Sequence, residues 1–134
     1  MPIVNNRVCQ AVVVSCMDFR FRERLFEELH SRYGVNSFDL ISLAGGGRNL
    51  AQGRTARSVV MDNIAISFRL RNQRLIIIAN HQDCGAYGGS QAFGCFEEER
   101  AFHDGEIDRA MDFLRRAFPG VQVEGMFLTL ESCG

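Results

Sequence analysis

The chain has 134 residues, 46% of them hydrophobic, which is the length of one domain with enough apolar material for a core. Its 15 basic and 16 acidic residues give a net charge of -1, so no broad electrostatic attraction to nucleic acid or to an anionic membrane is expected. All 15 of these basic residues are arginine, and lysine is absent. This excludes a lysine Schiff base and the Gly-Lys-Ser/Thr phosphate loop. We expect a small-molecule or protein partner.

The compartment follows from hydropathy and cysteine usage. No segment approaches the roughly 18 apolar residues that span a bilayer, and the N-terminal residues lack the apolar core of a signal peptide. The five cysteines are odd in number and widely spaced, which favours thiols in a reducing compartment over a disulfide scaffold. We therefore expect a cytoplasmic protein. As isolated cysteines, Cys9, Cys95 and Cys133 are expected to be small buried hydrophobic residues.

Short β-branched runs alternate with longer amphipathic segments along the chain. Strands are predicted at 8–15, 38–43, 74–79 and 121–130, helices at 21–33 and 53–70, and a helical segment at 88–118 with breaks at Gly94 and Gly105. This alternation predicts a single α/β domain over residues 1–134, with a mainly parallel sheet of about four to five strands flanked by helices. An antiparallel last strand at the sheet edge is left open.

Two polar turns follow predicted strands, at residues 16–20 and 80–85. Ligands of parallel sheets bind outside the carboxyl ends of the strands. If the first and third strands are neighbours, Cys16, His81 and Cys84 form one cluster.

We predict that these three residues are the ligands of a catalytic zinc site. His81 and Cys84 have the short spacing of a zinc-chelating loop, and two thiolates with one imidazole leave the fourth position of the metal to water. Such a zinc ion lowers the pKa of its bound water to about 7, giving a hydroxide for attack on a small carbon electrophile. In extended chain Asp18 and Arg20 point the same way as Cys16. Asp18 would orient the hydroxide, and Arg20 would keep Asp18 ionised.

Residues 16–20, Cys-Met-Asp-Phe-Arg, and residues 81–85, His-Gln-Asp-Cys-Gly, resemble the metal motifs of the β-class carbonic anhydrases. The resemblance covers most of the chain and includes, more weakly, the glycine-rich loop at 43–49 and the strand at 123–125. It implies zinc held by Cys16, His81 and Cys84, an Asp18–Arg20 dyad, and reversible hydration of carbon dioxide to bicarbonate. It also implies a homodimer or higher homo-oligomer with active sites near the subunit interface. The chain departs from the pattern at Phe19, where the family often has a small hydroxylic residue, and at Asn80, where glycine is usual.

Three other functions remain open. The same zinc site could hydrolyse carbonyl sulfide or carbon disulfide. Asp18 could be a permanent fourth ligand, which would make a closed, non-catalytic zinc site of two cysteines, one histidine and one aspartate. Cys16 and Arg22 have the spacing of cysteine-dependent phosphatases, although the loop between them lacks glycine and carries the repelling Asp18.

Several further side chains have only structural expectations. His30 and His103 lie on polar helical stretches, which predicts that both are solvated, with a proton-relay role as the alternative. Five phenylalanines are predicted to be core residues, or else buried against a second subunit, at positions 93, 96, 102, 113 and 118.

Overall fold

The computed structural model describes residues 8–130, which form four strands and four α-helices. In chain order these are β1 (Ala11–Ser15), α1 (Arg22–Tyr33), β2 (Phe38–Ser42), α2 (Arg48–Ala51), α3 (Ala56–Leu70), β3 (Leu75–His81), α4 (Phe96–Ala117) and β4 (Gln122–Leu128). Short 3-10 helices occupy Phe19–Phe21, Gly85–Tyr87 and Ser90–Ala92. No helix within residues 8–130 has the length and apolar character needed to cross a membrane.

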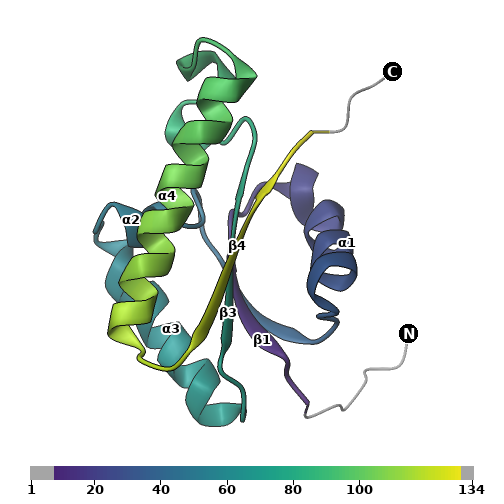
Figure 1. Ribbon diagram of the computed structural model, residues 1–134, viewed down its shortest axis with the longest axis vertical. Helices are drawn as coiled ribbons and strands as arrows, with labels where there is room; N and C mark the ends of the chain where they lie inside the picture. Colours follow the sequence, from purple (N-terminus) through teal and green to yellow (C-terminus); the bar gives the residue numbers. More distant parts are fainter. Residues whose placement is uncertain (1–7, 131–134) are drawn as a thin grey trace.

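The strands form one sheet in the order β2-β1-β3-β4, and every neighbouring pair is parallel. Helix α1 covers one face of the sheet, and α2, α3 and α4 cover the other (Figure 1). The predicted α/β domain with a parallel sheet and flanking helices is therefore confirmed. The last strand, whose direction the sequence left open, is parallel and lies at one edge.

Burial of the sheet on both faces explains the continuous apolar run of β1. Because side chains alternate along a strand, Val12 and Val14 pack with Ile76 and helices α3 and α4, whereas Val13 packs toward α1. All residues of β1 are buried. This double burial fixes the position of β1 in the middle of the fold and with it the position of the turn that follows.

The predicted helical segment at 88–118 is correct only from Phe96, where α4 begins, and the residues before it form no α-helix. Gly94 precedes α4, but Gly105 lies inside this helix, which continues through it without a break. A glycine in a helix interior costs only about 1 kcal/mol relative to alanine, which packing of the long α4 can override. Strand β3 extends to His81, two residues beyond its predicted end.

The predicted core positions of the phenylalanines hold only in part. Phe113 and Phe118 pack against the main core, and Phe93 is half-buried. Phe96 and Phe102 are substantially exposed on α4, so their assignment to the core of a single subunit is wrong. Both residues belong to the first turns of α4, the part of the helix that extends beyond the sheet (Figure 1).

We predict that alanine has opposite effects on stability at Gly105 of α4 and at Gly125 of β4. A Cβ at Gly125 would overlap Cγ2 of Ile107, so Gly125→Ala should lower the free energy of unfolding by about 1–3 kcal/mol. A Cβ at Gly105 would meet only Arg109, at 3.6 Å, so Gly105→Ala should raise it by about 0.5–1 kcal/mol. Urea unfolding of both variants measures the difference, and equal effects would contradict the packing of α4 on β4.

Candidate metal centre

The structure brings Cys16, His81 and Cys84 together at the carboxyl ends of two neighbouring strands. Strands β1 and β3 pair with Ser15 opposite Ala79, so Cys16 follows one strand where His81 ends the other. The two sulfur atoms are 4.0 Å apart, and the three potential ligand atoms all lie within 4.8 Å of one another. This group could hold a metal ion.

The histidine presents a free lone pair to the two sulfurs. Nδ1 of His81 lies 2.7 Å from the carbonyl oxygen of Gln82. A carbonyl only accepts, so Nδ1 carries the hydrogen and Nε2 carries the lone pair. Within the described chain Nε2 is buried without a hydrogen-bond partner. A buried acceptor beside two thiols suits a metal ion such as zinc, whose preferred ligands are sulfur and imidazole nitrogen.

The two thiols are not equivalent. A hydrogen bond from Cys84 lowers the pKa of Cys16, and the Gly45 amide, 3.4 Å from the Cys16 sulfur, lowers it further. The same contact raises the pKa of Cys84, and burial raises it further. Cys16 is therefore the more acidic of the two thiols.

Arg20 holds the Asp18 carboxylate and connects the two turns. Its Nη2 donates to Oδ2 of Asp18 at 2.7 Å, and its Nε lies 3.1 Å from Oδ1. Its Nη1 donates to Asp83 on the second turn at 3.1 Å. These hydrogen bonds from Arg20 lower the pKa of Asp18. Asp18 is therefore ionised beside the cluster, with its Oδ2 3.9 Å from Nε2 of His81.

Glu99 of α4 supports the second turn from beneath. Its carboxylate is buried and accepts the Asp83 amide hydrogen at 2.7 Å and the Ser90 hydroxyl at 2.9 Å. Asp83 has a left-handed backbone, with φ at 59°, which an L-residue adopts only when its surroundings hold it. Sequence reasoning missed Glu99 because it is the third of three consecutive glutamates, and nothing local separates it from the two exposed ones.

The prediction that His103 is solvated is wrong. Its side chain is fully buried, and its ring packs against Tyr87 and Phe127 with centroids 4.5 and 5.0 Å away. Its Nδ1 lies 3.1 Å from the side-chain nitrogen of Asn80. The acidic residues on the outer side of α4 gave this stretch its polar character and concealed the buried position. His30 is exposed, as predicted.

The remaining cysteines differ from one another. Cys95 is exposed, contrary to the expectation of burial, because it lies in the turn before α4. Cys9 is half-buried. Cys133 lies outside the described residues.

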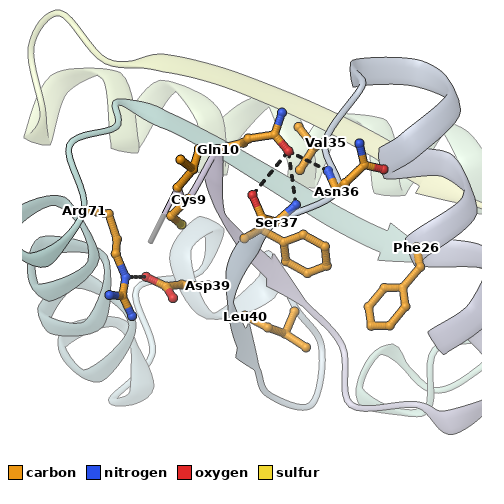
Figure 2. Close-up of a pocket in the computed structure, with 11 residues that line it drawn as sticks. Cys9, Gln10, Phe26, Val35, Asn36, Ser37, Asp39, Leu40 and Arg71 are labelled. Carbon is orange, nitrogen blue, oxygen red and sulfur yellow. Dashed lines mark hydrogen bonds and ion pairs between the residues drawn. The ribbon is translucent and has the colours of Figure 1, made fainter. Parts of the chain in front are cut away.

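A pocket of about 350 Å³ reaches the candidate site at Cys16 and Asp18, and its lining includes neither His81 nor Cys84. A larger groove of about 940 Å³ runs beside β2 and shares Phe26 and Leu40 with this pocket (Figure 2). The groove contains the ion pair between Asp39 and Arg71 but none of the three potential metal ligands.

A parallel α/β domain with cysteine and histidine ligands gathered at its strand ends defines a candidate metalloprotein, and comparison with known proteins gives the family. The sequence matches, over residues 6–133, the family described as "Putative carbonic anhydrase". The chain belongs to this family.

The chain is also similar to individual proteins and to a solved structure. Uncharacterized protein RC0076 of Rickettsia conorii is 28% identical, with 90% of this chain and 67% of the relative covered. An uncharacterized protein of Rickettsia bellii is 26% identical, with 90% and 76% covered. The crystal structure of β-carbonic anhydrase isoform I from Trichomonas vaginalis matches with a TM-score of 0.66 and 16% identity, covering 100% of this chain and 85% of that one. The structural match confirms the resemblance in fold to β-carbonic anhydrases.

The lowered pKa of Cys16 predicts selective reactivity of this thiol in metal-free protein. Since only a thiolate is alkylated, Cys16 should react with iodoacetamide at about pH 6, where an ordinary thiol with a pKa of about 8.5 is almost unreactive. Mass spectrometry of each cysteine peptide measures the rates. Exposed Cys95 is the internal comparison, and equal pH profiles for both residues would refute the asymmetry of the pair.

Proposed function

We propose that this protein is a zinc-dependent carbonic anhydrase that reversibly hydrates carbon dioxide to bicarbonate. The observation that carries the proposal is Nε2 of His81, which is buried beside the sulfurs of Cys16 and Cys84 and has no hydrogen-bond partner within residues 8–130. Membership in the family supports the same reaction. Because the ligands must be reduced thiols, we also propose a cytoplasmic location.

Cys16, His81 and Cys84 would hold the zinc ion, and their number leaves one position for water. When bound, zinc supplies Lewis-acid activation of water near neutral pH. Asp18 accepts a hydrogen bond from the reacting water and so directs its lone pair toward the carbon of the substrate. Arg20 keeps this carboxylate ionised and prevents its rotation, because both carboxylate oxygens are held by one guanidinium.

The contacts of Asp18 favour the catalytic site over the closed alternative, in which this aspartate would be the fourth zinc ligand. Ligation of the metal by Asp18 would have to compete with the bidentate pairing to Arg20, which Asp83 holds from the other side. Carbonyl sulfide and carbon disulfide require the same water activation, so these substrates remain alternatives within the same chemistry.

Substitutions at the site should separate metal binding from turnover. Cys16→Ala and His81→Ala should lose zinc and carbon dioxide hydration together, because each removes one of three protein ligands. Asp18→Asn should retain one zinc per chain and lower turnover by about 10- to 100-fold, since it keeps the shape but not the charge of the orienting group. Stopped-flow hydration with metal analysis of the same samples measures both quantities.

The matched control is Asp39→Asn, which changes a carboxylate in the groove beside β2, away from the three ligands. It should leave zinc content and turnover unchanged. Full zinc content in both ligand variants would refute the site. Wild-type protein with one zinc per chain and no hydration at any pH would refute the reaction and leave the closed site or the sulfur substrates.

We also propose that the protein is a homodimer formed through helix α3. Its outer surface carries an apolar stripe of Val59, Ile66 and Leu70, whose side chains are 53%, 39% and 61% exposed. The residues recur at helical spacing and therefore lie along one line of the helix. A stripe of this kind is typical of a helix that packs against another helix.

The charges beside the stripe identify a second copy as the occupant. Asp62 and Arg69 flank the stripe on the same side, and both are exposed. The stripe from 59 to 70 is centred between residues 64 and 65, and the pair 62 and 69 is centred between 65 and 66. When two α3 helices cross antiparallel at this point, Asp62 of each copy lies opposite Arg69 of the other. The surface is thus complementary to itself, as a two-fold interface requires.

A charge swap tests this arrangement. Asp62→Arg should raise the dimer dissociation constant on the order of 10-fold, because it places two arginines opposite each other in both symmetric pairs. Adding Arg69→Asp should restore the wild-type value. Sedimentation velocity over a concentration series measures the constants.

Ile66→Asp should give a monomer, and Phe96→Asp is its matched control because both side chains are 39% exposed. A wild-type monomer would refute the dimer. A dimer that the double charge swap fails to restore would refute the antiparallel α3 interface.

A further inference from the structure

We propose that Asn80 and His103 are positioning residues that fix the glycine turn, residues 45–47, next to Cys16. In this role His103 acts as a neutral hydrogen-bond acceptor. The inference rests on the proposed metal site, because the turn it fixes contacts a proposed ligand. Asn80 directly precedes His81 and is buried, and His103 approaches it from α4. Their contact therefore joins the metal-binding strand β3 to the helix that covers it.

The orientation of the Asn80 amide follows from its buried contacts. The amide N–H of Gly47 donates to Oδ1 of Asn80 at 2.9 Å, so this atom must be the oxygen. The side-chain nitrogen then faces Nδ1 of His103 at 3.1 Å and the Tyr87 hydroxyl at 3.3 Å. An amide nitrogen only donates, so Nδ1 of His103 must accept and the ring hydrogen must be on Nε2.

The contacts of Tyr87 lead to the same assignment of donors and acceptors at Asn80. The Tyr87 hydroxyl accepts from Asn80 and donates to the buried carboxylate of Glu106 at 2.9 Å. Gln52 and Arg109 also donate to this carboxylate, at 2.6 and 2.8 Å. Because an ionised carboxylate only accepts, the hydroxyl hydrogen of Tyr87 points to Glu106. The lone pair of the Tyr87 oxygen is then left to accept from Asn80. Both hydrogens of the Asn80 amide are therefore used.

The network acts on the metal site through the glycine turn. Gly46 has φ at 52°, and a Cβ there would lie 2.8 Å from the carbonyl oxygen of Ala79. A Cβ at Gly47 would lie 2.9 Å from Oδ1 of Asn80. The turn therefore packs directly against Asn80 and the backbone of β3. Its first glycine, Gly45, donates its amide hydrogen to the Cys16 sulfur at 3.4 Å, so displacement of the turn would change a hydrogen bond to a proposed ligand.

A positioning role explains His103 better than a proton relay. A relay needs a ring that exchanges protons at both nitrogens. Here Nδ1 is occupied by an N–H donor, and Nε2 is buried without a hydrogen-bond partner among the described residues. Protonation of Nδ1 would set two N–H groups against each other. The aromatic contacts with Tyr87 and Phe127 hold the ring in the orientation that presents its lone pair to Asn80.

The first part of the test uses metal-free wild-type protein, so that it does not depend on the proposed function. A long-range ¹H–¹⁵N correlation spectrum of protein labelled in the imidazole ring distinguishes the two tautomers and the imidazolium. At about pH 7 the expected result is a hydrogen on Nε2 and none on Nδ1 of His103. A hydrogen on Nδ1 would overturn the proposal.

The second part compares two substitutions of similar size. His103→Asn retains an acceptor, its Oδ1, at the position of Nδ1, whereas His103→Leu removes it. The leucine variant should show faster exchange of the Gly47 amide hydrogen, shifted thiolate-to-metal absorption bands in cobalt-substituted protein, and a cobalt dissociation constant raised on the order of 10-fold. The asparagine variant should stay close to wild type. His30→Leu, at an exposed histidine, is the control.

The outcomes separate the two proposals. Faster Gly47 exchange and shifted bands in the leucine variant alone would support the positioning role. Unchanged exchange and unchanged bands in that variant would overturn it, as would equal losses in the asparagine and leucine variants. If wild-type protein binds neither zinc nor cobalt, the metal site fails and the link to Cys16 fails with it, while the tautomer and the Gly47 exchange still decide the Asn80–His103 pairing.

Discussion

The candidate site depends on the parallel pairing of β1 with β3. Cys16 follows the first strand and His81 ends the second, and the register with Ser15 opposite Ala79 sets their separation. A strand advances about 3.3 Å per residue, so a slip of two residues would displace the ligands by about 7 Å. That is more than the 4.8 Å within which all three ligand atoms lie. The apolar core on both sheet faces fixes the register and hence the site.

The turns beyond the strand ends lack this core and are held by charged groups instead. Arg20 bonds Asp18 on its own turn and Asp83 on the other, and Glu99 holds Asp83 from beneath. A buried carboxylate is costly unless it is hydrogen-bonded, and the buried carboxylate of Glu99 accepts from Asp83 and Ser90. The hydrogen bonds of Asp83 to Glu99 and Arg20 also stabilise its left-handed backbone. Hydrogen bonds between charged groups therefore hold the turns of the site in place, whereas apolar packing holds the strands of the sheet.

This division explains what the sequence could predict. Strands such as β1 and β3 are evident from their apolar runs, and the ligand residues from their positions at strand ends. Glu99 and His103 were missed because their partners, Asp83 and Asn80, are far away in the sequence and leave no local pattern. Local composition even misled, since His103 lies on an acidic stretch of α4. Gly105 misled in the opposite direction, because helix packing overrides a weak propensity.

Asn80 and His103 are best understood as one unit. A buried amide or imidazole without a partner costs about 1–3 kcal/mol, so either residue alone would destabilise the fold. Together they satisfy the Asn80 amide and Nδ1 of His103, with Tyr87 and Gly47 as the other partners of the amide. Glycine, usual in β-carbonic anhydrases at the position of Asn80, would need neither the histidine nor the tyrosine. The departure at Asn80 is therefore matched by His103 in α4, and the two residues together preserve the turn that carries the hydrogen bond to Cys16.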